Sequence, residues 1–302
     1  MQCLVMKFGG TSLGDAQRID RAADAVADAR GDGAVAVVVS AMTGVTDRLV
    51  GLIGAARAQP GVARAAIEAI IDSHRTVARE LGIGTIDAAP WSIERLHERL
   101  RERGIDSAIV PAEVLIRTHV ENGDVEVDGA TTRANICTRG DTFWRPLVRI
   151  VPGFTAADAD AHATTLGRNA SDYSAAWLAC ALGWPLEIRT DVAGCYSADP
   201  RHVPGTRLLR RLSLVDAHRF ARSGASVIHA RTLEPLLADP VPLSIVNSFA
   251  SSAERSRIGA ADSEILRGVA RRDDLRLLRG AGALAAIEAF DRGRDVVADC
   301  AI

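Results

Sequence analysis

Short apolar runs alternate with amphipathic stretches along most of the chain. The first apolar run is Cys3–Phe8; after it come a glycine turn and a segment whose apolar residues share one helical face: Ile19, Ala22, Ala23, Val26 and Ala27. These periods predict a strand, a loop and a helix that begins near Asp15. A second apolar run, Ala34–Val39, leads into a polar segment where Thr46 can cap the next helix. The strand, loop and helix unit therefore repeats.

The middle of the chain has a different pattern. Residues 62–120 are predicted to be mostly helical, with helices over Ala65–His74 and Ile93–Arg103. The segment Gly123–Asp141 alternates and is rich in Gly, Thr and Asp, which favours a hairpin or a lid. Leu147–Val151 is predicted to be another buried strand.

The second half returns to regular alternation. A polar loop ends at Ser171-Asp172, which opens a predicted helix, and four further elements follow: strand Pro185–Arg189, a helix capped by Ser213, a helix through Thr232–Leu237 and strand Val241–Val246. Strands that alternate with helices indicate a mainly parallel sheet covered on both faces, which is an α/β fold of three layers.

The last fifty residues are predicted to form a separate, smaller unit. Residues 251–260 are polar and are predicted to be a linker. A strand, a helix and a strand are expected at Leu275–Leu278, Ala283–Phe290 and Val296–Ala301. Such a segment is too short for an independent domain, so we expect it to dock on the main body or to pair across a dimer.

Composition narrows the class of partners. Of the 302 residues, 48% are hydrophobic and 4% aromatic, and 36 basic residues nearly balance 38 acidic ones. No basic face is set up for nucleic acid or a membrane surface, so small-molecule partners are expected. The N-terminal apolar run is too short for a signal peptide and no run approaches 18 apolar residues, which predicts a cytoplasmic protein. The five cysteines lack metal or redox spacing and are predicted to be reduced.

One residue type is singled out by its rarity. Lys7 is the only lysine, so the other 35 basic residues are arginines. An ammonium differs from a guanidinium where a compact charge must touch one phosphate group. Lys7 stands beside Gly9 and Gly10, and the next residues open a helix, where backbone N–H groups favour an anion. The turn is not a Walker loop, because the lysine precedes the glycines, and by itself it is equally compatible with a tight structural turn.

Five segments in order make the pattern specific. They read KFGGTSLG (7–14), VSAMTGVTD (39–47), TTLGRNASDYSAAWLACALG (164–183), RTDVAGCYSADPR (189–201) and SGASVIHARTLEP (223–235). Together they resemble the aspartokinases of the amino-acid-kinase family. The resemblance covers residues 1–250 and implies a catalytic domain with an eight-stranded, mostly parallel sheet, an N-terminal lobe that binds an amino acid and a C-terminal lobe that binds ATP. It further implies that residues 251–302 are a linker and part of an ACT-like module.

The resemblance also assigns roles. Lys7 and Asp172 would be catalytic, with Mg²⁺ held through the ATP phosphates rather than by a dedicated protein site. Nucleotide binding would fall to Lys7, Gly9, Gly10, Ser12, Thr190, Asp191, Tyr196 and Arg201. Amino-acid binding would fall to Ser40, Ala41, Thr46, Glu113, Arg168 and Ser171. The implied product is 4-phospho-L-aspartate, and the aspartate carboxylate, whose pKa is about 3.9, needs no general base to attack the γ-phosphate.

The chain departs from the family pattern at three places. Asn169-Ala170 replaces the usual Gly-Gly after the arginine, Ala193 replaces an aspartate, and Ser226 replaces a lysine that contacts nucleotide phosphate, with Arg222 near enough in sequence to compensate. The tail has the length of about half an ACT module, whose open strand edges favour a homodimer. Two alternatives to aspartate kinase activity therefore stay open: a kinase for another small carboxylic or amino acid, and a regulatory homologue that binds an amino acid or nucleotide without turnover.

Overall fold

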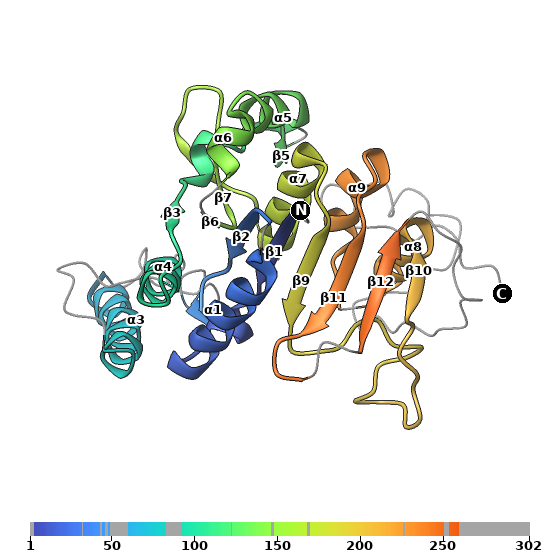
Figure 1. Ribbon diagram of the computed structural model, residues 1–302, viewed down its shortest axis with the longest axis horizontal. Coiled ribbons are helices and arrows are strands. Elements are labelled where there is room, and N and C mark those ends of the chain that lie inside the picture. Colours follow the sequence, from blue (N-terminus) through green and yellow to red (C-terminus); the bar gives the residue numbers. More distant parts are fainter. Residues whose placement is uncertain are drawn as a thin grey trace.

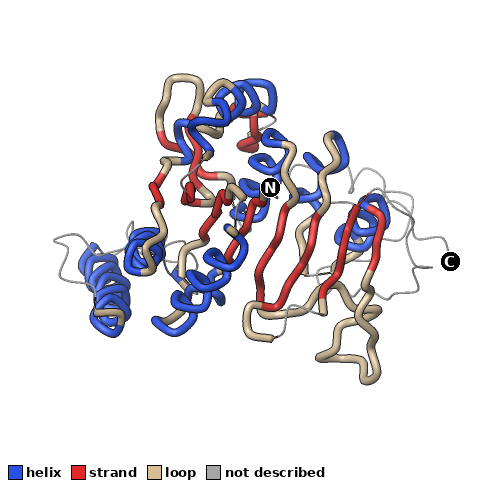
Figure 2. The backbone as a smooth tube through the Cα atoms, viewed as in Figure 1, coloured by secondary structure: helices blue, strands red, loops and turns tan. Residues whose placement is uncertain are grey.

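The computed structural model describes residues 3–259, apart from 32, 43, 46–47, 49–59, 83–91, 122, 146–147, 168–169, 226 and 251–253. Figure 1 shows a central sheet with helices on both of its faces, and Figure 2 shows how its strands lie side by side. The predicted three-layer α/β/α arrangement is confirmed.

The sheet holds eight strands in the order β10-β12-β11-β9-β1-β2-β6-β3, as the resemblance implied. Every neighbouring pair runs parallel except β11 and β12. The strands are β1 (Leu4–Phe8), β2 (Val35–Val39), β3 (Ser107–Ile109), β6 (Val148–Pro152), β9 (Leu186–Thr190), β10 (Arg211–Ser213), β11 (Leu243–Asn247) and β12 (Arg255–Gly259).

Two antiparallel hairpins stand outside the sheet. One pairs β4 (Thr118–Glu121) with β5 (Asp124–Val127), and the other pairs β7 (Thr155–Ala157) with β8 (Ala163–Thr165). The hairpin predicted within Gly123–Asp141 thus begins earlier, at Thr118. The rest of that segment is helical, because Asp128 caps a helix by accepting a hydrogen bond from the backbone N–H of Thr131.

Ten helical elements in the described part of the chain alternate with strands or groups of strands and helices. They are η1 (Gly10–Leu13), α1 (Ala16–Arg30), α3 (Pro60–Glu80), α4 (Ser92–Glu102), η2 (Ala112–Val114), α5 (Gly129–Cys137), α6 (Gly140–Trp144), α7 (Ala170–Leu182), α8 (Leu214–Arg222) and α9 (Ala230–Ala238). Two predicted helix starts are confirmed by their caps: Asp15 accepts from the N–H of Arg18, and Ser213 accepts from that of Asp216.

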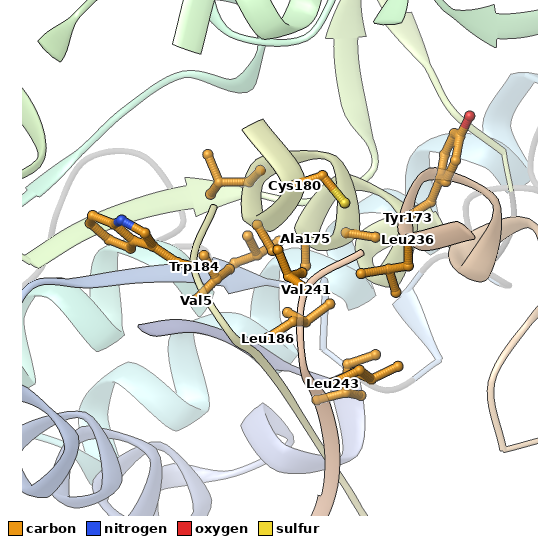
Figure 3. Packing of buried hydrophobic residues seen from close by; sticks show 14 of the residues in the cluster. Val5, Tyr173, Ala175, Cys180, Trp184, Leu186, Leu236, Val241 and Leu243 are labelled. Carbon is orange, nitrogen blue, oxygen red and sulfur yellow. The ribbon is translucent and has the colours of Figure 1, made fainter. Parts of the chain in front are cut away.

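The pleat of β1 sends its side chains into two different cores. Val5 is in register with Leu186 of β9, and both pack against α7 and α9, as Figure 3 shows. Met6 and Phe8 point to the opposite face, where the core is formed with α1, α3 and α4. Because side chains alternate along a strand, Lys7 lies on the same face as Val5. The strand itself therefore aims the single lysine at α7.

One sequence-based prediction about the regular elements is wrong. The predicted linker 251–260 contains β12, which pairs with β11 and β10 inside the sheet. A polar sequence hides this strand because Arg255 and Arg257 alternate with buried Ser256 and Ile258. The predominantly helical stretch 62–120 also contains β3 and β4. The strands and helix expected between 275 and 301 lie outside the described residues.

The four cysteines in the described part of the chain are not paired in disulfides. Cys3, Cys137, Cys180 and Cys195 are free thiols, and all but Cys137 are buried. Burial raises the pKa of both Cys180 and Cys195 to about 12, so these thiols stay protonated. In the portion that the structure describes, no helix has the length and apolar character needed to cross a membrane.

Candidate active site

The candidate site is built at the edge where the carboxyl ends of the central parallel strands meet. Lys7 stands near the end of β1, Ser40 directly after β2, Thr190 at the end of β9 and Asn247 at the end of β11. Parallel strands present these ends at one edge of the sheet, which is where ligands bind in open α/β folds. Four chain segments that are distant in sequence thereby contribute to one place.

Lys7 and Asp172 form the central contact. The Lys7 ammonium lies 2.5 Å from an Asp172 carboxylate oxygen, and the two side chains are only 8% and 15% exposed. Asp172 belongs to the first turn of α7, where the helix dipole favours a negative charge. The two residues to which the resemblance assigns catalytic roles are therefore in direct contact. A buried cation held by one carboxylate can place its remaining donors toward a phosphate group.

The glycine turn directly follows this lysine. Gly9 donates its backbone N–H to the Arg189 carbonyl at 3.1 Å, which ties the turn to β9. A Cβ added at Gly9 would lie 3.5 Å from the Lys7 ammonium nitrogen, so a side chain here would fill the space next to that charge. Gly10 is the first residue of η1, so the glycine turn leads into a helical turn, as the sequence predicted.

Ser40 and Ser171 connect β2 to the same end of α7. Their hydroxyl oxygens are 2.6 Å apart, and Ser171 is 9% exposed. The approach is close because Gly153, after β6, has no side chain. A Cβ there would lie 2.6 Å from Ser171 Cβ. Gly153 therefore allows the first turn of α7 to reach the strand ends.

Three residues predicted to bind nucleotide are linked to one another through the loop after β11. Ser12 and Ser248 have their hydroxyl oxygens 2.7 Å apart, and the Ser248 backbone N–H donates to the Thr190 carbonyl at 2.8 Å. Asn247 donates its side-chain N–H to the Asp191 carbonyl at 3.0 Å. Thr190, Asp191 and Ser12, all predicted as nucleotide contacts, are thus brought together by the loop after β11.

Tyr196 and Arg201 lie on the loop that follows β9, farther from these contacts. Tyr196 forms an isolated bridge with Leu208, and Arg201 pairs with Asp199 at 2.7 Å while remaining 74% exposed. The hydrogen bonds from Arg201 lower the pKa of Asp199 to about 2. Among the described contacts, none links Tyr196 or Arg201 to Lys7, so their nucleotide roles stay predictions.

Four of the predicted amino-acid contacts are not brought into the Lys7 cluster by described contacts. Glu113 lies in η2, and within the described residues no hydrogen bond or ion pair links it to Lys7 or Asp172. Ala41 follows Ser40 and is exposed. Thr46 and Arg168 lie outside the described residues, so their roles stay predictions.

Sequence reasoning overlooked several residues that support the site. Asn247 ends the apolar strand β11 and Ser248 follows it. A polar pair at the end of a predicted parallel strand is a signal that could have found them. Ser92, at the start of α4, donates its hydroxyl to the Ser40 carbonyl at 2.9 Å. Arg95, on the next turn, is fully buried and donates to the sulfur of Met42. No local pattern links Ser92 to Ser40 or Arg95 to Met42, because each contact spans about fifty positions.

Two of the departures from the family pattern can be located. Ala170 is 4% exposed and packs within the core shared by α7 and the sheet, so its methyl group is in the protein interior. Ala193 is 7% exposed and its carbonyl accepts from the N–H of Ser256 on β12. Asn169 and Ser226 lie outside the described residues.

Comparison with known proteins identifies the family to which this fold belongs. The model of the amino acid kinase family matches residues 2–247. An aspartokinase from Pseudomonas aeruginosa is 35% identical, over 82% of this chain and 56% of the relative. A bifunctional aspartokinase/homoserine dehydrogenase from Haemophilus influenzae is 33% identical, over 92% of this chain and 39% of the relative.

A solved structure supports the same relationship. Escherichia coli aspartokinase III in complex with aspartate and ADP superposes with a TM-score of 0.73 at 27% identity, covering 95% of this chain and 73% of that one. The chain spans about half the length, or less, of the two curated relatives named above. A match over residues 2–247 covers most of the described fold, and the chain therefore belongs to the amino acid kinase family, with aspartokinases among its relatives.

Proposed function

We propose that this chain transfers the γ-phosphoryl group of ATP to the side-chain carboxylate of L-aspartate and forms 4-phospho-L-aspartate and ADP. The observation that carries the proposal is the buried contact between Lys7 and Asp172, 2.5 Å apart where the carboxyl ends of β1 and β9 meet the first turn of α7. The aspartokinases that the chain resembles are named for this activity.

The chemistry needs positioning and charge neutralisation rather than a base. A carboxylate oxygen of the substrate would form a bond to the γ-phosphorus while the bond from that phosphorus to the β,γ-bridging oxygen breaks, and ADP takes that electron pair. Two anions must meet, so a cation is required between them. Lys7 supplies one positive charge, and Asp172 holds its ammonium in place.

The two substrates would approach from different sides of this lysine. Ser40 and Ser171 would face the amino acid, and the glycine turn with Ser12, Thr190 and Asp191 would face the nucleotide. Among the described residues, no group of three or more His, Cys, Asp or Glu side chains could hold a metal ion. We propose that Mg²⁺ accompanies the ATP phosphates, and the contact of Asp172 with Lys7 supports the proposal that Asp172 is the carboxylate nearest to the transferred group.

A hydroxylamine trap of the acyl phosphate tests the proposal directly. The chain is incubated with ATP, Mg²⁺ and hydroxylamine, with L-aspartate and, in parallel, a panel of other small carboxylic and amino acids. Hydroxamate formed with aspartate supports the proposal, and hydroxamate formed only with another acid replaces aspartate by that substrate. If no acid gives product while calorimetry detects amino-acid binding, the chain is a binding protein and the kinase proposal fails.

A further inference from the structure

Arg231, on the first turn of α9, contacts three other segments of the chain. One arm of its guanidinium donates to the Leu166 carbonyl at 3.3 Å. The other arm donates to the Val125 carbonyl at 2.8 Å and to the Glu126 carboxylate at 2.7 Å. The guanidinium also lies over the Tyr173 ring, 4.8 Å from its centre. One side chain thus contacts β5, the chain before α7, and α7 itself.

The contact with Leu166 lies four positions before the first residue of α7. Leu166 follows β8, is 1% exposed, and donates its own N–H to the Phe154 carbonyl at 2.9 Å. Gly167 follows with a φ of 82°, a conformation that suits glycine, and α7 begins at Ala170. Both polar backbone groups of Leu166 are therefore engaged just before the chain enters the helix that carries Ser171 and Asp172.

The hairpin β4–β5 is linked to the same region from its other side. Thr118 shares a hydrogen bond with Thr164, with their hydroxyl oxygens 2.9 Å apart, and also donates to the Ala157 carbonyl. Gly129, just after the hairpin, packs so closely on α7 that a Cβ would lie 2.4 Å from the Trp177 ring. The hairpin, β8 and α7 form one packed group, and Arg231 attaches that group to α9.

An ordinary surface ion pair does not explain this arrangement. Exposed pairs contribute little, whereas Arg231 is 27% exposed and satisfies two backbone carbonyls in addition to a carboxylate. Desolvation raises the pKa of nearby Glu234, and the positive charge of Arg231 opposes that rise. Loss of the guanidinium would leave the Leu166 and Val125 carbonyls without this donor and the Glu126 carboxylate without its cation.

We propose that Arg231 is a positioning residue for phosphoryl transfer: it fixes the hairpin β4–β5 and Leu166 against α9, and so holds the first turn of α7 in register with Lys7. The inference rests on the proposed function for its kinetic consequence. The printed contacts of Arg231 include neither Lys7 nor Asp172, so its action on the site is indirect. It acts through Leu166 and Tyr173, which lie on either side of Ser171 and Asp172 in the sequence.

The test compares Arg231→Ala with Arg133→Ala in the hydroxamate assay. Arg133 forms an ion pair with Asp239, so it links α5 to the end of α9 without contacting Leu166 or the hairpin. We expect Arg231→Ala to lower kcat/KM for the amino acid about tenfold or more, as the loss of a hydrogen-bonded charge permits, while Arg133→Ala stays near the unsubstituted chain. Arg231→Lys should recover only part of the loss, because one ammonium cannot replace both arms.

Two further measurements separate positioning from general stability. Millimolar guanidinium chloride, well below denaturing concentration, should partly restore Arg231→Ala and leave Arg133→Ala unchanged. Deuterium uptake of residues 154–167 should rise in Arg231→Ala alone. Unchanged kinetics and uptake in Arg231→Ala, or equal losses in both variants, would overturn the proposal. If the unsubstituted chain has no turnover, the proposed function fails, and deuterium uptake still decides whether Arg231 holds the loop.

Discussion

Two ion pairs, one at the Lys7 end of the site and one on the nucleotide loop, show how differently this fold uses charge. Lys7 and Asp172 are separated by 165 positions in sequence and are almost buried, whereas Arg201 and Asp199 are two positions apart and the arginine is 74% exposed. The first pair exists only because β1 and α7 pack together. The second forms within one turn of chain.

This contrast indicates which ion pairs hold the reacting groups in place. A buried charge that loses its partner is strongly unfavourable, so the Lys7 pair constrains both elements that carry it. An exposed pair is screened by water and salt and constrains little. We therefore expect the consequences of substitution to fall steadily from the Lys7 contact to the Arg201 contact.

The largest effect is expected at the buried pair. Lys7→Met and Asp172→Asn should each lower kcat by about 10²–10³, the usual cost of removing one well-placed charge-stabilising group. Steady-state kinetics with aspartate and ATP measure the loss, and circular dichroism checks that the variants fold. Arg75→Met, which removes an exposed pair with Asp72 on α3, is the matched control. A Lys7→Met variant that folds and keeps a normal kcat would show that the buried pair does not contribute to catalysis.

The second largest effect is expected from a substitution that fills the space next to Ser171. Gly153→Ala places a Cβ 2.6 Å from Ser171 Cβ, so α7 or the turn after β6 must shift. We expect the free energy of unfolding to fall by about 1–3 kcal/mol, as in other overpacked cores, and the KM for the amino acid to rise. Denaturant titration and kinetics measure the two effects.

Gly259→Ala provides the control for that experiment, because a Cβ there would meet nothing within 4 Å. If Gly153→Ala is as stable and as active as Gly259→Ala, the close approach of α7 to the strand ends has no role in binding.

A smaller effect is expected on the nucleotide side. Ser12→Ala and Ser248→Ala should each raise the KM for ATP about two- to tenfold, which corresponds to one net hydrogen bond. Because the two hydroxyls share that bond, the double variant should be little worse than either single one. Ser223→Ala, which removes an exposed hydroxyl at the end of α8, is the control. Fully additive losses would show that the two serines act separately.

The smallest effect is expected at the exposed pair. Arg201→Ala should change the KM for ATP by roughly twofold or less, since exposed pairs are weak. The pKa of Asp199 is lowered to about 2, so its carboxylate stays charged at neutral pH and the pair is lost only as the pH falls from about 4 toward 2. The ratio of KM values for Arg201→Ala and the unsubstituted chain should therefore be constant from pH 6 to 9. A ratio that changes with pH would contradict an effect due to Arg201 and Asp199 alone and would point to His202, whose ring nitrogen lies 3.9 Å from the Asp199 carboxylate.

Local patterns in the sequence predicted much of this arrangement. The run Cys3–Phe8 and the glycines after it placed Lys7 at the end of a strand, and Ser213 marked a helix start that the structure confirms. The same reasoning took 251–260 for a linker, because β12 alternates arginines with small buried residues and its identity depends on pairing with β11. Glu113 was assigned by resemblance alone, and its placement in η2 supplies no described contact with Lys7.

Periodicity and residue types, which are local properties of the chain, were sufficient to predict the alternation of the main apolar strands with helices, the class of fold and the importance of the lone lysine. Only the tertiary structure decided that Ser171 reaches Ser40, that Ser248 meets Ser12 and that Arg231 holds Leu166. These contacts join residues 65 to 236 positions apart. Their geometry is set by sheet register and helix packing, which no local pattern specifies.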